Sequence, residues 1–145
     1  MCGISGFVDY SNKTSLEVLE KMNRSLAHRG PDGEGYSIYK NESATVGLGH
    51  RRLSIIDLSP GGSQPKSFGS LHITYNGEVY NHVEIKKELE GKGHIFQTHS
   101  DTEVILHAYA EWGSKCMRRF IGMFAFVIYD TKEEEIICLP RPAGD

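Results

Sequence analysis

The segment FIGMFAFVIYD (120–130) carries very few polar side chains, which limits the folds open to the chain. A β-prone run of this kind predicts a buried strand. TKEE (131–134) has the composition of a turn, and EIICL (135–139) then predicts a second strand that pairs with the first as a hairpin. The chain therefore contains a sheet whose central part lies in a hydrophobic core.

Helices are grouped between runs of strands along the rest of the chain. Composition and flanking turn residues predict strands over 4–8, 36–40, 45–50 and 71–75, the middle two forming a hairpin. Apolar residues at helical spacing, capping residues and closing glycines predict helices over 15–27, 81–93 and 100–113. The pairs Thr14/Glu17 and Ser100/Glu103 have capping-box spacing at two helix starts. This order predicts a layered α+β fold rather than a regular βαβ winding.

Composition excludes several classes of protein. The chain of 145 residues fits one domain, and a net charge of -3 argues against a protein that mainly binds nucleic acid. The three cysteines are widely spaced and odd in number, which favours a reducing cytosol. The histidines and cysteines show no metal-ligand spacing, and no apolar run is long enough to span a membrane. We expect a soluble cytoplasmic protein without a metal.

A cysteine stands at position 2, which is an unusual place for a core residue because chain ends are usually exposed. If Met1 is removed, Cys2 gains a free α-amino group. Such a group has an ordinary pKa of about 7.7–8.0 and can accept the thiol proton. Nucleophile and base then belong to one residue. On position alone, Cys2 is equally well explained as a small residue that favours removal of Met1.

The dipeptide Asn76-Gly77 offers a side-chain amide donor next to an unobstructed backbone N–H. Together they would form an oxyanion hole, in which one donor contributes about 2.7 to 4 kcal/mol. Asn-Gly is also a strong hairpin signal, and alone it favours a turn. The helical pattern that follows weakens the hairpin interpretation.

Charged residues near these motifs are candidates for substrate binding. An arginine of the pair Arg51-Arg52 suits a carboxylate, although most such pairs are merely solvated. Asp101 falls in the first turn of a predicted helix, where the helix dipole favours a carboxylate with or without a ligand. The histidines beside the motifs have no assignable task and are interpreted as structural: His28, His50 and His82.

Seven ordered motifs resemble the glutaminase domain of asparagine synthetases and related class II glutamine amidotransferases. They are MCGISGF, HRGPDGEG, GHRRLSIIDLS, QP, YNGEVYNH, SDTEVIL and GMFAFVIYD, and they cover residues 2 to about 139. The resemblance implies the fold of N-terminal nucleophile hydrolases, a four-layer αββα sandwich of two antiparallel sheets. It also implies that Cys2 is the nucleophile, with Asn76 and Gly77 as the oxyanion hole.

The same resemblance assigns the substrate-binding residues. Arg52 occupies the position at which the family binds the α-carboxylate of L-glutamine. Asp101, with Glu78, occupies the position at which the family binds the α-ammonium group. The pocket lining falls on Leu53, Ser54, Ile55 and Ile56. The family passes the released ammonia to an ATP-using synthetase domain. This domain is expected to need no cofactor, with ATP and Mg required only by the synthetase domain.

The resemblance to the glutaminase family ends after residue 139, where the chain reads PRPAGD. Because proline cannot donate to a sheet ladder, we expect the last strand to stop before Pro140. We therefore expect an incomplete glutaminase domain over 1–139, a divergent tail over 140–145, missing C-terminal strands and no synthetase domain. An exposed sheet edge would favour a homo-oligomer. A catalytically silent interaction module is the alternative function, and a self-processing hydrolase is less favoured because Arg52 and Asp101 suit a free amino acid.

Overall fold

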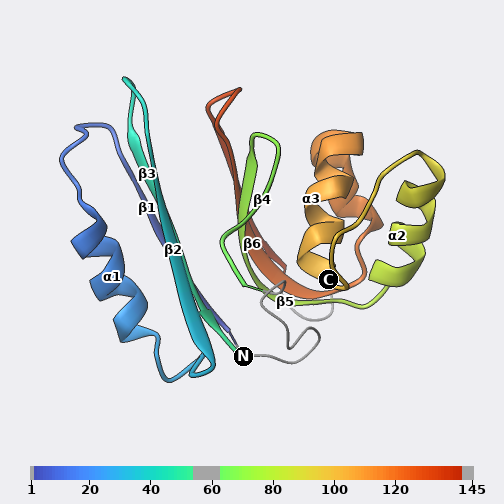
Figure 1. Ribbon diagram of the computed structural model, residues 1–145, viewed down its shortest axis with the longest axis horizontal. Coiled ribbons are helices and arrows are strands. Elements are labelled where there is room, and N and C mark those ends of the chain that lie inside the picture. Colours follow the sequence, from blue (N-terminus) through green and yellow to red (C-terminus); the bar gives the residue numbers. More distant parts are fainter. Residues whose placement is uncertain (1, 54–62, 142–145) are drawn as a thin grey trace.

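Two antiparallel sheets face each other in the computed structural model, which describes residues 2–53 and 63–141 (Figure 1). The first sheet has the strand order β1-β3-β2, and the second has the order β4-β5-β6-β7. The strands are β1 (Gly3–Asp9), β2 (Gly33–Lys40), β3 (Thr45–Arg52), β4 (Lys66–Phe68), β5 (Leu71–Val79), β6 (Gly122–Asp130) and β7 (Glu135–Arg141). The helices are α1 (Leu16–Ser25), α2 (His82–Gly91) and α3 (Asp101–Trp112), followed by a short 3-10 helix (Gly113–Arg119).

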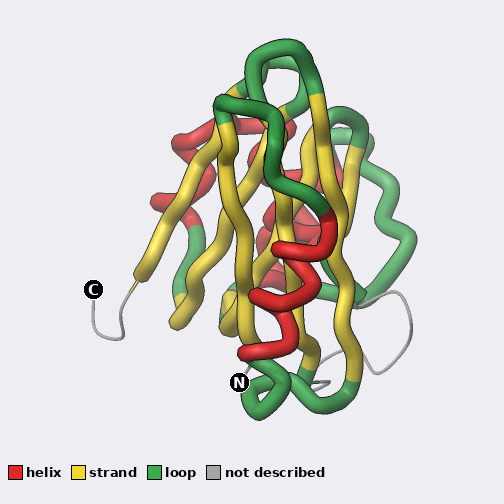
Figure 2. Tube along the Cα trace, turned by 90° about the vertical axis from the view of Figure 1, so that its left-hand side faces the viewer, coloured by secondary structure: helices red, strands yellow, loops and turns green. Residues whose placement is uncertain are grey.

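The helices cover the outer faces of the two sheets. Helix α1 lies over the first sheet, and α2 and α3 lie over the second, so the layers run α, β, β, α (Figure 1). Figure 2, turned by 90°, shows α1 in front of the strands that it covers. The predicted α+β class and the αββα layering are confirmed, as are both predicted hairpins, β2–β3 and β6–β7.

A polar anchor ties α1 to the sheet beneath it. Asn23 is fully buried, and its side-chain amide donates to the carbonyls of Gly35 (3.0 Å) and His50 (3.2 Å). The Ser5 hydroxyl donates to Asn23 Oδ1 over 2.7 Å. A Cβ at Gly49 would lie 2.5 Å from the same Oδ1, so only glycine allows this close approach. One side chain therefore connects α1 to β1, β2 and β3.

Two hydrophobic clusters fill the remaining layers. The larger lies between the second sheet and its helices and includes Ile73, Leu89, Ile105 and Phe126. The smaller lies between the two sheets and consists of Val46, Leu48 and Tyr129, with Val127 packed against it. Odd-numbered residues of β5 enter the larger cluster, so its even-numbered residues face the first sheet.

Both predicted capping boxes are wrong. The N-cap of α1 is Ser15, whose side chain makes no cap bond, while Thr14 bonds the Asp9 carboxylate through its N–H (2.7 Å) and its hydroxyl (2.6 Å). Ser100 does cap α3 by accepting from the N–H of Thr102 over 3.1 Å. The carboxylate of Glu103 binds the loop before the helix instead of completing the box. In both cases one side chain of the predicted box, Thr14 or Glu103, bonds a nearby polar group instead.

Strands β5 and β7 run through residues that the sequence predicts to be a turn or a strand end. Strand β5 continues through Asn76-Gly77 to Val79, so this dipeptide is not a hairpin turn. Strand β7 continues through Pro140 to Arg141, so the expectation that it stops before Pro140 is wrong. In the described part of the chain β7 is the last strand of its sheet, and an edge strand tolerates a residue without an N–H.

Candidate active site

Strand register brings the predicted site residues to the facing surfaces of the two sheets. Ile4 of β1 pairs with His50 of β3, so these residues share a face. That face looks at the second sheet, because His50 Nε2 lies 2.9 Å from the carbonyl oxygen of Tyr75. Side chains alternate along a strand, so Cys2 and Arg52, each two residues further toward the same end, follow this face.

Strand β5 supplies the opposite surface. The hydroxyl of Thr74 donates to the carbonyl of Gly49 over 2.8 Å, which shows that Thr74 points at the first sheet. Asn76 lies two residues further along β5 and therefore points the same way. Cys2, Arg52 and Asn76 consequently come from three strands but share the space at one end of the sandwich.

Cys2 is partly buried and held against the end of β3. The N–H of Leu53 donates to Cys2 Sγ over 3.2 Å, and the thiol lies 3.5 Å from the Leu53 carbonyl oxygen. The Arg29 guanidinium donates from Nε to the Cys2 carbonyl over 3.2 Å. These contacts fix the position of the sulfur at the end of β3. The surroundings of Cys2 thus suit a nucleophile as well as a structural residue.

The two adjacent arginines point in opposite directions. Arg51 pairs with Glu34 over 2.8 Å and donates from Nε to the Gly30 carbonyl over 3.0 Å. Arg52 shares the face of His50 and donates to the Ser63 hydroxyl over 3.4 Å. The register therefore commits Arg51 to the framework and puts Arg52 on the side of Cys2.

Gly77 is required by the backbone geometry of β5. Its φ is 132°, and a Cβ there would lie 2.1 Å from the carbonyl oxygen of Met123 on β6. Any larger residue would push these two paired strands apart. The role of the Gly77 N–H as an oxyanion-hole donor stays a prediction. In the structure, Gly77 allows the close approach of β5 and β6. Glu78, the next residue, is exposed.

Asp101 begins α3 and is 4% exposed. Its Oδ2 accepts a 2.6 Å hydrogen bond from the Tyr75 hydroxyl and a 3.3 Å bond from the Val79 N–H. Burial raises the pKa of Asp101, and the Tyr75 hydrogen bond opposes that rise. The carboxylate that is predicted to bind the substrate ammonium thus lies beside the strand that carries Asn76.

Sequence reasoning missed two residues that connect these parts. His50, interpreted as merely structural, is 1% exposed, and burial lowers its pKa to about 4. It is therefore neutral near pH 7 and donates from Nε2 to Tyr75. Gln64 accepts from the Tyr75 N–H over 2.6 Å and donates to the Thr102 hydroxyl over 3.3 Å. Gln64 belongs to the QP motif, and its two hydrogen bonds give this motif a structural role.

Four residues named in the predictions, Met1, Ser54, Ile55 and Ile56, lie outside the described residues. Within residues 2–53 and 63–141, no group of three His, Cys, Asp or Glu side chains is placed to hold a metal ion. No helix in this part of the chain is long and apolar enough to cross a membrane.

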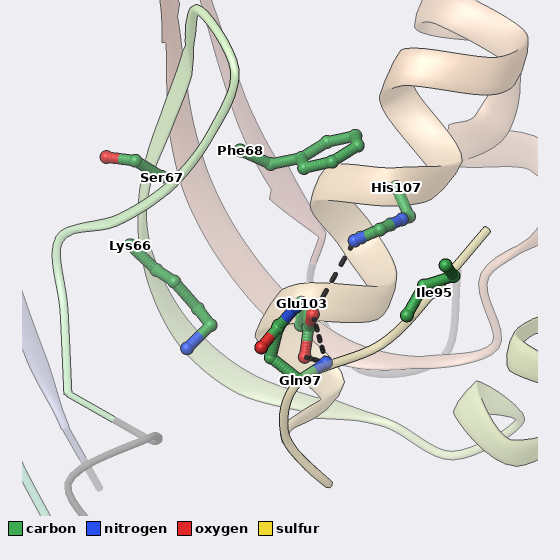
Figure 3. Close-up of a pocket in the computed structure, with 7 residues that line it drawn as sticks. All are labelled: Lys66, Ser67, Phe68, Ile95, Gln97, Glu103 and His107. Carbon is green, nitrogen blue, oxygen red and sulfur yellow. Dashed lines mark hydrogen bonds and ion pairs between the residues drawn. The ribbon is translucent and has the colours of Figure 1, made fainter.

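A cavity of about 200 Å³ lies between β4, α3 and the loop that precedes α3 (Figure 3). Its described lining contains none of the predicted site residues and consists of Lys66, Ser67, Phe68, Ile95, Gln97, Glu103 and His107. Phe68 stacks on the imidazole of His107, with ring centroids 3.9 Å apart. The cavity is a feature separate from the space around Cys2.

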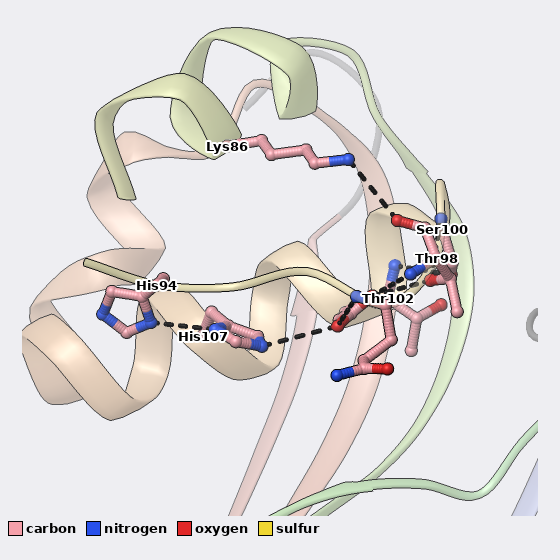
Figure 4. A network of polar contacts seen from close by, with 8 residues as sticks. Lys86, His94, Thr98, Ser100, Thr102 and His107 are labelled. Carbon is pink, nitrogen blue, oxygen red and sulfur yellow. Dashed lines mark hydrogen bonds and ion pairs between the residues drawn. The ribbon is translucent and has the colours of Figure 1, made fainter. Parts of the chain in front are cut away.

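A polar network beside this cavity fastens the loop before α3 (Figure 4). The Glu103 carboxylate accepts from the N–H groups of Gln97 (2.9 Å) and Thr98 (2.8 Å). Burial would raise the pKa of Glu103, but these hydrogen bonds together lower it. His94 Nδ1 and His107 Nδ1 lie 2.8 Å apart, and burial lowers the pKa of His107. The network fixes the segment that leads into Asp101.

Comparison with known proteins agrees with the resemblance. A family model described as a glutamine amidotransferase domain matches residues 1–142. Asparagine synthetase (glutamine-hydrolyzing) 1 of Bacillus subtilis is 41% identical over 153 residues, which cover 99% of this chain and 23% of that protein. Asparagine synthetase (glutamine-hydrolyzing) 2 of Oryza sativa subsp. japonica is 42% identical over 149 residues, which cover 99% and 24%. The chain therefore spans about a quarter of the length of these relatives.

A solved structure shows the fold. Glutamine phosphoribosylpyrophosphate amidotransferase from B. subtilis, complexed with ADP and GMP, matches 97% of this chain and 37% of its own with a TM-score of 0.74. At 22% identity this likeness bears on architecture alone, and it confirms the αββα sandwich. Since the family match covers nearly the whole sequence, the chain belongs to the family of glutamine amidotransferase domains and is similar to the matched part of glutamine-hydrolysing asparagine synthetases.

Proposed function

We propose that this chain hydrolyses L-glutamine to glutamate and ammonia, with Cys2 as the nucleophile after Met1 is removed. The supporting observation is the strand register that gathers Cys2, Arg52 and Asn76 at one end of the facing sheets. Family membership supports glutamine as the substrate, because the two synthetases compared above are named as glutamine-hydrolysing enzymes.

The first half of the proposed reaction forms a thioester. The α-amino group of Cys2 takes the thiol proton, and the thiolate attacks the side-chain amide carbon of glutamine. The Leu53 N–H stabilises the thiolate, and the Asn76 amide with the Gly77 N–H stabilises the oxyanion. The C–N bond then breaks, and the protonated amine gives its proton to the departing ammonia.

The second half releases glutamate. Water, losing a proton to the α-amino group, attacks the thioester carbon, the C–S bond breaks, and the thiolate regains a proton. These steps need no cofactor. Arg52 and Asp101 hold the α-carboxylate and the α-ammonium group, which fixes the side-chain amide over the thiol. Opposite charges at the two ends select a free amino acid rather than a peptide.

Ammonia is a product that a synthetase would use. We propose that it supplies an ATP-dependent amidation of the asparagine synthetase type, because about a quarter of each compared synthetase matches this chain. ATP and Mg would belong to that synthetase reaction. A cytoplasmic location and association with a second copy of the chain stay predictions from the sequence.

The test is the intact mass of the chain before and after incubation with a glutamine-mimicking diazo-ketone electrophile. We expect a chain that lacks Met1 and takes up one adduct. Cys2→Ala should take up none. Cys138→Ala is the matched control, because Cys138 is also a free cysteine and is more exposed than the partly buried Cys2, and this variant should be labelled like the wild type.

Two results would contradict the proposal. One is an adduct that persists in Cys2→Ala but disappears in Cys138→Ala, which would place the reactive thiol elsewhere. The other is a chain that has lost Met1 and still takes up no adduct. The second result would favour the alternative of a catalytically silent interaction module.

A further inference from the structure

Tyr75 is bonded through three of its groups to three separate parts of the chain. Its N–H donates to Gln64 Oε1 (2.6 Å), its carbonyl accepts from His50 Nε2 (2.9 Å), and its hydroxyl donates to Asp101 Oδ2 (2.6 Å). The residue is 3% exposed, and so these bonds form away from water, where each is stronger and more costly to lose. No assigned role explains why a tyrosine stands at this position.

The backbone bonds of Tyr75 fix the strand that presents Asn76. His50 lies on β3, two residues before Arg52, and its bond to Tyr75 spans the gap between the sheets. Thr74 makes a second bond across the same gap, to the carbonyl of Gly49. These two bonds lie next to Asn76 on β5 and close to Arg52 on β3, so they fix the distance between the proposed oxyanion donor and the arginine.

The hydroxyl of Tyr75 acts on Asp101. Burial raises the pKa of Asp101, which favours the neutral acid, and the Tyr75 hydrogen bond favours the carboxylate. Burial and the Asp101 charge raise the pKa of Tyr75 far above its ordinary value, so the phenol keeps its proton. Tyr75 thus donates to Asp101 at every physiological pH, and the donated bond also restricts rotation of the carboxylate.

We infer that Tyr75 is a positioning residue, whose hydroxyl holds the Asp101 carboxylate in place for the α-ammonium group of glutamine. This inference rests on the proposed function, because it assumes that Asp101 binds the substrate. It adds a residue that does not touch glutamine but sets how well Asp101 binds it. A tyrosine serving only as packing in the core beside α3 would affect stability and leave glutamine binding unchanged.

The experiment measures glutamine binding in the Cys2→Ala background, where no reaction can occur. Calorimetry gives the dissociation constant with Tyr75 and with Tyr75→Phe, at about pH 7 and at about pH 5.5. Tyr129→Phe is the matched control, because Tyr129 is also 3% exposed and its hydroxyl bonds Asn41 in the core between the sheets. Thermal unfolding of each variant reports whether the fold is kept.

We expect Tyr75→Phe to weaken glutamine binding about tenfold at pH 7, because the charge-assisted hydrogen bond that orients the Asp101 carboxylate is lost. The loss should be larger at pH 5.5, because Asp101 without this bond takes up a proton more readily. Tyr129→Phe should bind as the parent does. In an Asp101→Asn background, Tyr75→Phe should have no further effect, as in a double-mutant cycle between coupled residues.

The inference is overturned if Tyr75→Phe binds glutamine as tightly as the parent, or if its effect persists undiminished in Asp101→Asn. It is also overturned if Tyr129→Phe weakens binding equally, or if the parent binds no glutamine. The chemistry of Cys2 is judged separately by the diazo-ketone adduct. A chain that binds glutamine but takes up no adduct would refute the proposed hydrolysis while leaving the role of Tyr75 intact.

Discussion

The backbone N–H of Leu53 lies 3.2 Å from the sulfur of Cys2 and donates to it. Leu53 directly follows Arg52, so the candidate nucleophile touches the segment that is predicted to grip the substrate carboxylate. Contact between residues so far apart in sequence depends on the pairing of β1 with β3.

Arg52→Gln should raise the KM for glutamine by about 10- to 100-fold with a small change in kcat, because a charge-assisted bond to the α-carboxylate is lost. Arg51→Gln is the matched control. It removes the pair with Glu34 and should leave the KM close to that of the wild type. Steady-state glutaminase assays of both variants decide the matter, and a larger KM effect in Arg51→Gln would reverse the assignment.

Asn76→Ala should lower kcat by about 10²- to 10³-fold while changing the KM little, because an oxyanion donor acts mainly in the transition state. The side chain of Asn76 is partly exposed, so its removal should leave the fold intact. Stopped or continuous ammonia assays provide the rates. A variant with normal kcat would exclude Asn76 from the oxyanion hole.

Gly77→Ala should destabilise the chain by about 3 kcal/mol or more, because its φ of 132° is unfavourable for alanine and the new Cβ would collide with Met123. Gly69→Ala is the control. Gly69 also has a positive φ, 59°, but a Cβ there meets nothing within 4 Å, so the cost should be about 1 kcal/mol. Urea unfolding compares the two. Equal losses would show that the contact with β6 is unimportant.

The free energy of unfolding should fall as the pH is lowered from about 6.5 to about 4. The pKa of His50 is about 4 in the fold, so in this range the unfolded chain binds a proton that the folded chain refuses. The difference from an ordinary pKa of about 6.5 corresponds to about 3 kcal/mol. Below pH 4 both states are protonated, and this contribution stays constant.

His50→Gln isolates this contribution, because glutamine keeps an N–H donor and does not titrate. Urea unfolding across the same pH range should show a shallower dependence in the variant. The difference between the two slopes removes the contributions of other histidines, including His107. Parallel curves for wild type and variant would show that His50 does not resist protonation in the fold.

Local sequence was sufficient for most elements and for the family. Apolar spacing located α1, closing glycines located α2, the capping residue Ser100 located α3, and the β-prone runs located both hairpins. These patterns repeat over a few consecutive residues, so they can be read from the sequence without knowledge of the tertiary structure. The seven motifs were sufficient for family membership, since their order and spacing extend over nearly the whole chain.

Tertiary structure decided which side chains can act together. The sequence presents Arg51 and Arg52 as equivalent, and only the register of β3 against β1 and β2 turns one toward Glu34 and the other toward the second sheet. Likewise, Asn76-Gly77 has the composition of a turn, but pairing with β6 keeps β5 extended through it.

The sequence by itself determined the chemical groups at the site, while the fold determined their partners. His50, Gln64 and Tyr75 carry no local signal of their connection, because their bonds join segments that lie far apart in the chain. Backbone pairing between distant strands sets the face on which each side chain lies, and burial then lowers the pKa of His50 and raises the pKa of Asp101. Both effects depend on contacts that exist only after the two sheets have packed together.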